Sequence, residues 1–583
     1  MKRRDRFAVA GLILMLAIVG GAMYATDYGE SPEPTPIYAT PTPAVTYREG
    51  VVGHPSSIDP LTASTQVDRD LVALLFRGLL RAGPNGTLLP DLARSWAVSP
   101  DGLTYTFNMR TDARWEDGQP VTAADVVFTV GLAQDANYDG PLGGSWQGIT
   151  ATAVGSNVVR FTLTTPLGGF LRQTLLPILP QHLLAQTDVT DLADSDFSAQ
   201  PIGDGPYRIA EMDDTHILLT RVADVPTASV SSAAGDTPGS AGASGSVAGA
   251  TVTAGVTTGA TAAAPGNIDN IDMIFFDSEA SAVASFQAGN LDTLGGLTPE
   301  SVEAAATRAG AGISRYPLTS LYSVVLNQRA SHPEFGKLSV RQGLLAAIDQ
   351  STILETALLG LGTVADGPLP NWSPSYDPAA VTATAYSTSD AAADLVAAGW
   401  IHAQSGWTLP NAKSPYAIKL LSPDETTSPV TYQIAVEVAA EWRDLGLDVS
   451  LQTVDAADYT QNLSTGDFDA AVVDYQLGLD PDVSPLLLSS QAAPAGSNLS
   501  GVTDASLDQL LTAVRTTSDP AARQTAISAV EKYVSTNVLM LPICFADYEF
   551  VISDRVQGIS TNEIADPSGR YWDVLDWRLA SDG

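Results

Sequence analysis

The residues from 89 to 130 constrain the fold of this chain more than any other stretch. They begin with the pattern of a strand pair around Asp101-Gly102, a tight-turn dipeptide. After the turn, apolar and polar residues alternate from 103 to 110, and Trp96 and Val98 carry the same alternation before it. An alternation of period two indicates strands with one buried face. The stretch therefore predicts a β-hairpin.

A helix start follows in the same stretch. Thr122 and Asp125 have the spacing of a capping box, in which the hydroxyl and the carboxylate satisfy free backbone N–H groups of the first turn. Val126, Val127 and Val130 then form an apolar face at helical spacing. A sheet followed by a capped helix indicates an α/β protein, and nothing in the stretch resembles a catalytic constellation.

Several short sequence motifs in this stretch resemble those of a known protein family. They are Pro90-Asp91-Leu92-Ala93 with Ser95-Trp96, Ser99-Pro100-Asp101-Gly102 with Tyr105 and Phe107, Asp117-Gly118, and Ala124-Asp125-Val126-Val127. Each motif is weak alone, but their order and spacing are specific. The chain resembles the extracytoplasmic solute-binding proteins of family 5, the oligopeptide-, dipeptide- and nickel-binding components of ABC importers. The resemblance implies a two-lobe, periplasmic-binding-protein-like α/β fold with a ligand cleft between the lobes and a first lobe enlarged by an extra subdomain.

Composition excludes several classes of partner and site. The formal net charge of −36 argues against nucleic acid, because a polyanion would be repelled. The chain holds one cysteine, Cys544, so it can form neither an internal disulfide nor a cysteine-rich metal site. Cys544 lies in an apolar run and is expected to be a buried structural thiol.

The pattern of the N-terminal residues 1–30 indicates a membrane anchor or an export signal. Lys2, Arg3 and Arg4 precede an uncharged segment, residues 7–25, that as a helix is about long enough to cross a bilayer core. Cleavage after small residues near Gly21 is the alternative. We favour the anchor, which places the protein on the extracytoplasmic face of the plasma membrane. A cleaved signal would make it secreted or periplasmic.

The rest of the chain divides by composition and by resemblance. Residues 31–46 are a proline-rich linker that is expected to stay extended. Lobe I with its extra subdomain is expected over 47–316, lobe II over 317–539, and a return to lobe I over 540–583. Residues 223–267 are an insert of small and polar residues that is expected to be disordered. A helix is expected over 71–80.

Sequence motifs do not favour an enzyme. The chain has no H-E-x-x-H, no G-x-S-x-G and no phosphate-binding P-loop, and its five histidines are scattered. We therefore expect no catalytic residues, no cofactor and no metal site. The expected function is that of an importer's receptor, which binds peptides and needs a separate permease and ATPase subunits. Nickel chelates, sugars or other organic solutes are the alternatives within this fold, and a cell-surface hydrolase or a structural surface protein are alternatives of another class.

The resemblance also implies which residues face the ligand. Ser64 and Thr65 fall at the mouth of the cleft, and Asn327 ends a strand that in relatives crosses into the second lobe. Trp372 lies in a proline-rich loop, residues 367–377, like those that line the cleft. These four residues are candidate ligand contacts.

The segment after the strand 467–474 bears on the charge of the ligand. Peptide binders of the family hold the ligand's ammonium with an aspartate three residues before an Asp-Pro or Glu-Pro pair. Here the pair is Asp480-Pro481, and Leu477 stands three residues back. A leucine cannot neutralise an ammonium, and burying that charge unpaired is costly.

Two interpretations of this leucine stay open. If loop lengths differ from those of relatives, Asp474 is the nearest substitute for the missing carboxylate. Otherwise the ligand is not held by a free amino terminus, and neutral groups contact it instead. The candidates for those neutral contacts are Tyr475, Gln476, Asn327, Ser64 and Thr65.

Overall fold

A computed structural model describes residues 44–222 and 266–580, except for 141, 143 and 495. The predicted anchor, most of the linker and residues 223–265 of the insert lie outside the described part. The last two residues of the predicted insert form strand β10 (Gly266–Asn267), which pairs with β22 (Arg578–Leu579). The prediction of disorder was therefore wrong for these two residues, because backbone hydrogen bonds to the C-terminal strand order them.

One mixed sheet of 11 strands runs through the described body. Its path in order is β18 (Asp448–Val454), β17 (Ala417–Pro423), β19 (Ala470–Gln476), β13 (Ala311–Leu326), β20 (Leu541–Ser553), β12 (Thr293–Gly295), β1 (Thr46–Val52), β11 (Asn270–Phe276), β9 (His216–Arg221) and β8 (Tyr207–Met212), with β14 (Gly362–Val364) beside β20. Parallel pairs such as β1–β11 and β17–β18 confirm the predicted α/β class.

The remaining strands form smaller sheets. A four-stranded sheet has the order β4 (Ala93–Val98), β5 (Thr104–Met109), β7 (Val158–Leu163) and β6 (Ile149–Ala153). The others pair β2 (Leu80–Ala82) with β3 (Leu88–Pro90), β15 (Ile401–Ala403) with β16 (Gly406–Thr408), and β22 with both β10 and β21 (Val556–Gln557).

The helices fall between these strands. They are α2 (Gln66–Leu75), α3 (Ala123–Ala133), α4 (Phe170–Gln173), α5 (Gln181–Leu184), α6 (Asp196–Ala199), α7 (Glu279–Gln287), α8 (Pro299–Ala306), α9 (Leu338–Ala346), α10 (Gln350–Ala357), α11 (Thr388–Ala397), α12 (Pro429–Asp444), α13 (Ala456–Thr465), α14 (Ser484–Leu487), α15 (Ala505–Thr516) and α16 (Pro520–Asn537). Short 3-10 helices are η1 (Pro84–Gly86), η2 (Val189–Asp191), η3 (Ser489–Gln491) and η4 (Pro567–Asp576).

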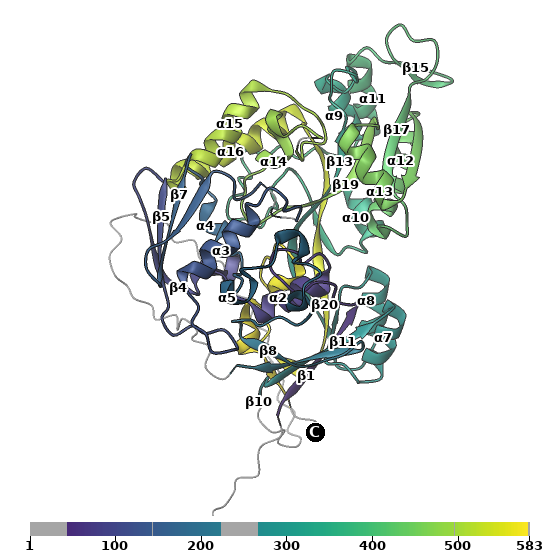
Figure 1. Cartoon of the computed structure of the whole chain (residues 1–583). Helices are drawn as coiled ribbons and strands as arrows, with labels where there is room; N and C mark the ends of the chain where they lie inside the picture. Colours follow the sequence, from purple (N-terminus) through teal and green to yellow (C-terminus); the bar gives the residue numbers. More distant parts are fainter. Residues whose placement is uncertain (1–43, 141, 143, 223–265, 495, 581–583) are drawn as a thin grey trace, which may run out of the picture. The chain divides into compact units, whose positions relative to one another are not determined.

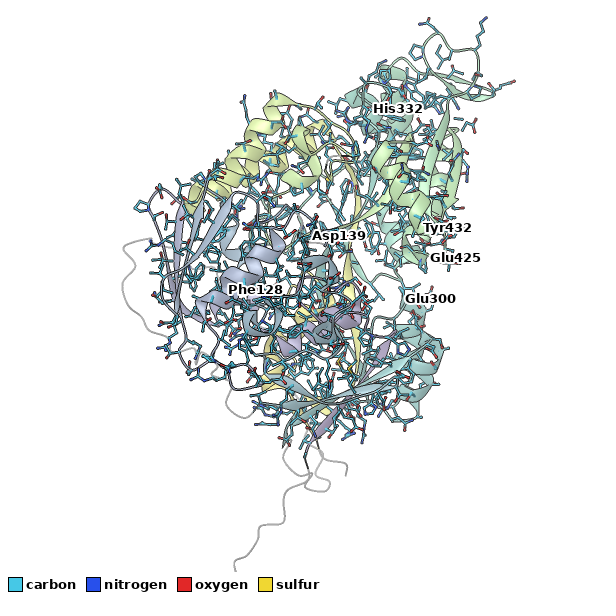
Figure 2. All side chains as sticks on the ribbon, in the orientation of Figure 1. Phe128, Asp139, Glu300, His332, Glu425 and Tyr432 are labelled. Carbon is cyan, nitrogen blue, oxygen red and sulfur yellow. The ribbon has the colours of Figure 1, made fainter. Side chains whose placement is uncertain are left out.

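The predicted hairpin and helix start are both confirmed. Strands β4 and β5 pair antiparallel, and Tyr105 and Phe107 on β5 are buried in the largest hydrophobic core. At the start of α3, the backbone N–H and the hydroxyl of Thr122 both donate to Asp125 Oδ2, at 2.8 and 2.9 Å. Phe128 on α3 packs partly buried against the same core (Figure 2).

Two long strands connect the parts of the molecule. β13 and β20 pair antiparallel over most of their length, with register shifts between Pro317 and Leu321 and between Tyr322 and Ser323 (Figure 1). At the upper end of this pair, β13 also pairs with β19, and at the other end β20 pairs with β12. The predicted crossing strands thus join separate cores, one around β1, α2 and β5 and another among α9, α12 and β17. This is the expected two-lobe fold, while the residue boundaries of the lobes stay a prediction.

Two local predictions need a comment. Helix α2 spans Gln66–Leu75 rather than 71–80, because Thr65 caps its N-terminus. Cys544 is buried in the second core, and burial raises the pKa of its thiol to about 12, as expected of a structural thiol. Within the described residues, no helix has both the length and the apolar character needed to cross a membrane.

Candidate functional site

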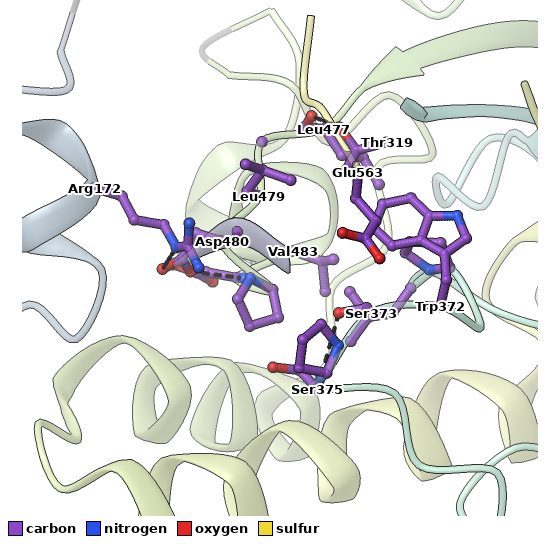
Figure 3. A pocket seen from close by; sticks show the side chains of 17 residues that line it. Arg172, Thr319, Trp372, Ser373, Ser375, Leu477, Leu479, Asp480, Val483 and Glu563 are labelled. Atoms are coloured by element: carbon purple, nitrogen blue, oxygen red, sulfur yellow. Dashed lines mark hydrogen bonds and ion pairs between the residues drawn. The ribbon is translucent and has the colours of Figure 1, made fainter. Parts of the chain in front are cut away.

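A pocket of the described body lies where six segments meet (Figure 3). It encloses about 680 Å³, part of it open to solvent, which is in the range of small-molecule sites. The segments contribute Gly86 and Arg172, Thr319 on β13, residues 369–375, residues 477–483, and Glu563. Chain segments far apart in sequence therefore meet around one space, next to the crossing strands.

The loop after β19 forms one wall of the pocket. Leu477 follows directly on the strand, and its carbonyl accepts the Thr319 hydroxyl while its N–H donates to the Thr319 carbonyl at 3.4 Å. Farther along, Asp480 Oδ1 accepts the N–H of Asp482 at 3.0 Å, an Asx turn that orders the loop. The structure thus places Leu477 in the wall of the pocket.

Asp480 belongs to an ion-pair network at this wall. Arg523 Nη2 lies 2.6 Å from Asp480 Oδ1, and Arg172 Nε lies 4.0 Å from Asp480 Oδ2. Burial lowers the pKa of Arg172, an effect that Asp480 opposes and Arg523 reinforces. Arg172 Nη1 is buried without a hydrogen-bond partner. Two guanidinium groups therefore share the Asp480 carboxylate.

The proline-rich loop forms another wall, which includes Trp372. The N–H of Ser373 donates to the Pro370 carbonyl at 2.9 Å, and Gln524 Nε2 on α16 donates to the Ser375 carbonyl at 2.7 Å. These bonds hold the loop against α16 and place the partly buried Trp372 indole on the pocket. Leu369, Leu477 and Val483 are apolar neighbours in the lining.

Glu563 completes the pocket from the C-terminal segment. The next residue, Ile564, donates its N–H to the Pro317 carbonyl at 3.0 Å and accepts the Thr319 N–H at 3.3 Å. Its backbone is therefore fixed against β13. Glu563 Oε2 is buried and has no hydrogen-bond partner. Figure 3 shows Glu563 on the side of the pocket away from Arg172 and Asp480.

Three predicted ligand contacts do not line this pocket, and their polar groups already serve the fold. Thr65 caps α2, where its hydroxyl accepts the backbone N–H of Asp68 at 3.1 Å. The backbone N–H of Ser64 donates to the side-chain carboxylate of Asp68 at 3.3 Å. Asn327 is fully buried, and its Nδ2 donates to the carbonyls of Gly466 and Phe468. The roles predicted for these residues stay predictions.

The residues at the end of β19 divide between the pocket and its surroundings. Asp474 accepts the Ser320 hydroxyl at 2.5 Å and Gln476 Nε2 at 2.7 Å, and neither Asp474 nor Gln476 lines the pocket. Burial raises the pKa of Asp474, and these two hydrogen bonds oppose that shift. Tyr475 packs against apolar cores, and burial raises the pKa of its hydroxyl. Of the eight predicted residues, the structure brings Trp372 and Leu477 together.

Sequence reasoning missed Arg172 and Glu563, which each carry an atom without a hydrogen-bond partner at the pocket. Arg172 lies in α4, and Glu563 lies in an irregular segment; no motif surrounds either residue. Their relevance appears only once the chain folds.

Sequence reasoning also missed a group with metal-ligand chemistry outside the pocket. His332, Glu334 and Asp469 offer ligand atoms within 4.8 Å of one another. Figure 2 labels His332, which precedes α9. The Tyr416 hydroxyl lies 2.8 Å from a carboxylate oxygen of both acids, and His332 Nδ1 lies 3.1 Å from Asp469. The three side chains are therefore engaged with one another and with Tyr416.

Comparison with known proteins decides the family. The model for bacterial extracellular solute-binding proteins, family 5 (Middle), matches residues 87–497, more than half of the chain. This chain belongs to that family. Similar proteins include Protein XP55 of Streptomyces lividans, 25% identical over 88% of this chain and 85% of that protein. The oligopeptide-binding protein AppA of Bacillus subtilis is 24% identical over 81% of this chain and 80% of its own.

Solved structures show the same fold. AppA of B. subtilis in complex with a nonapeptide has a TM-score of 0.70 and 21% identity, and covers 93% of this chain and 100% of that one. NikZ of Campylobacter jejuni in complex with Ni(L-His) has a TM-score of 0.71 and 21% identity, over 92% of this chain and 100% of that one. The family and these neighbours are solute-binding proteins rather than enzymes.

Proposed function

We propose that this family 5 protein is the receptor of an ABC importer, and that its solutes are peptides delivered to a membrane permease with separate ATPase subunits. The pocket beside the crossing strands carries this proposal. Arg172, Trp372, Leu477 and Glu563 come from four distant parts of the chain and line one space. A solute in that space contacts all four parts and so favours whichever arrangement brings them together. A permease can then distinguish a loaded receptor from an empty one.

The chemistry of the lining supports a peptide. Its apolar side chains suit apolar side chains of a ligand, and the unpartnered Arg172 Nη1 is a donor suited to a carboxylate or a carbonyl. Relatives named for oligopeptide binding cover most of this chain. The relative solved with Ni(L-His) keeps nickel chelates as the alternative, and sugars or other organic solutes stand behind it. We propose binding and not catalysis for this site.

Export and lobe organisation belong to the same proposal. We place the folded body outside the cytoplasm, held by the N-terminal segment 1–30 as an anchor through the linker 31–46. Lobe I is assigned to 47–316 and 540–583, and lobe II to 317–539. A receptor that binds solute outside the cytoplasm and delivers it to a membrane permease has to be located at the outer face of that membrane.

Mass spectrometry of the solute released from natively purified protein tests the proposal. We expect peptides, and we expect a Trp372→Ala variant purified in parallel to carry less of them, because the variant removes an aromatic ring from the pocket lining. Release of a nickel chelate or a sugar would replace the peptide assignment. Release of no solute from wild-type protein, together with no binding of added peptides, would refute the receptor.

A further inference from the structure

We propose that Glu563 is the acceptor for a cationic group of the solute, so that the pocket takes ligands with an ammonium on an apolar body. The assignment rests on the proposed receptor function. Its first basis is the state of the carboxylate, since Glu563 lines the pocket while its Oε2 is buried and unpartnered. A buried acceptor without a donor is unfavourable, more so when charged, and a ligand that supplies a donor removes that cost.

The second basis is a comparison of the carboxylates in the lining. Asp480 Oδ1 is paired with Arg523 at 2.6 Å, and its Oδ2 has no hydrogen-bond partner but lies 4.0 Å from Arg172 Nε. Asp482 receives the Ser484 N–H at 2.9 Å and lies 3.6 Å from Arg515. Among the described residues of the lining, Glu563 is the carboxylate without a cationic partner. The acceptor that is available to a ligand's cation is therefore Glu563.

The third basis is the fixed position of Glu563. Hydrogen bonds on both sides of the Ile564 peptide tie this segment to β13 at Pro317 and Thr319. Thr319 in turn bonds the carbonyl of Leu477, so the backbones that carry Glu563 and Leu477 are held by one residue of β13. A carboxylate from the C-terminal segment thus faces the pocket that Leu477 lines without a charge.

The lining defines the class of ligand. Leu369, Leu477, Leu479 and Val483 are apolar, and Trp372 adds an aromatic ring, a surface that also attracts cations. Arg172 carries positive charge on the far side of the pocket from Glu563 (Figure 3). This separation of charge suits a peptide with a free amino terminus and apolar side chains.

Calorimetry on the full chain tests the assignment with the tripeptide Leu-Ala-Leu in free and N-acetylated form. We expect wild-type protein to bind the free amine at least 30-fold more tightly than the acetylated form. In Glu563→Gln the preference should fall below threefold, while affinity for the acetylated peptide stays within threefold of wild type. Asp474→Asn is the matched control and should keep the preference. Glu563→Ala serves as the second variant if the glutamine variant does not fold.

A second probe separates this assignment from the peptide function. n-Butylammonium and n-butanol are titrated into wild-type protein and Glu563→Gln, and we expect the wild type alone to prefer the ammonium. If peptides do not bind but this preference is seen, the peptide function fails and the Glu563 assignment stands. If free and acetylated peptides bind wild type equally, or the preference disappears in Asp474→Asn rather than in Glu563→Gln, the assignment is wrong. Absence of any ammonium preference with both probes overturns it as well.

Discussion

Arg523 Nη2 on α16 lies 2.6 Å from Asp480 Oδ1 in the loop after β19. The ion pair connects a helix to the loop that forms one wall of the pocket, and both side chains are largely buried, at 14% and 22% exposure. Arg172 approaches the same carboxylate from the N-terminal part of the chain. Asp480 therefore holds the pocket wall in place and is not itself available to a ligand's cation.

Removing this carboxylate should destabilise the protein. In Asp480→Asn, two partly buried guanidinium groups lose their counter-charge, and we expect a loss of about 1–3 kcal/mol in the free energy of unfolding. Denaturant unfolding followed by circular dichroism measures it. Asp482→Asn is the matched control: its partner Arg515 is 42% exposed, and such an ion pair contributes about 0–1 kcal/mol. Equal losses in the two variants would contradict the role given to Asp480.

A buried charge cluster in the core around β1, α2 and β5 should be the part of that core whose substitution lowers the free energy of unfolding most. Arg570 Nη2 lies 2.6 Å from both Glu49 Oε1 and Asp70 Oδ2, and all three side chains are at most 2% exposed. Arg570→Met leaves two buried carboxylates without a cation, so we expect a loss of about 3–5 kcal/mol in the free energy of unfolding.

The control for this prediction is Arg69→Met. Arg69 lies 2.8 Å from Asp566, but these side chains are 38% and 36% exposed, so the variant should lose no more than about 1 kcal/mol. Thermal and denaturant unfolding of both variants decide the comparison. A loss for Arg570→Met as small as that for Arg69→Met would show that the cluster adds little.

Asp204 should make stability fall as pH rises. Burial raises the pKa of Asp204 to about 8, while Arg77 opposes that shift. The folded state thus holds a proton that the unfolded state releases near pH 4, so the contribution of Asp204 is complete below that pH and is lost as pH rises toward 8.

The variant Asp204→Asn tests this pH dependence. It should remove a slope of up to about 1.4 kcal/mol per pH unit between pH 4 and 8. The exposed Asp101 is the control: hydrogen bonds from Ser99 and Leu103 lower its pKa, so Asp101→Asn should change the slope only in acid. Unfolding measured at several pH values would contradict the prediction if Asp204→Asn kept the wild-type slope.

Arg172 should recognise the acidic end of the solute. Its Nη1 is buried and unpartnered in the pocket wall, and a ligand carboxylate would satisfy it. We expect Arg172→Met to weaken a free tripeptide about tenfold or more, and to weaken the matching peptide amide less than threefold, as measured by calorimetry. Equal weakening of both peptides would mean that Arg172 acts only through Asp480.

The elements around residues 89–130 could be predicted because local sequence patterns indicate them strongly. The alternation around Tyr105 and Phe107 and the capping pair Thr122–Asp125 predicted the hairpin and the helix start that form. Thr65 was predicted as a ligand contact although it caps α2, since a hydroxyl before a helix has the same sequence appearance in both roles.

The site was less predictable, because its residues meet only through long-range pairing. Leu477 and Trp372 line the pocket, and both lie in segments that the sequence marked, the loop before Asp480-Pro481 and a proline-rich loop. Glu563 could not be assigned to the pocket from the sequence, because nothing in its neighbourhood shows that Ile564 bonds to β13 and directs this segment to the pocket. The sequence around Asn327 likewise does not indicate that its side-chain amide donates hydrogen bonds to the carbonyls of Gly466 and Phe468.

A crystal structure of the natively purified protein with its retained solute tests the central claim most directly. The account predicts solute density in the pocket, against the Trp372 indole and the Leu477 side chain, with a polar contact to Arg172. Solute density at another place on the protein, with the space between Trp372 and Leu477 filled only by water, would contradict it.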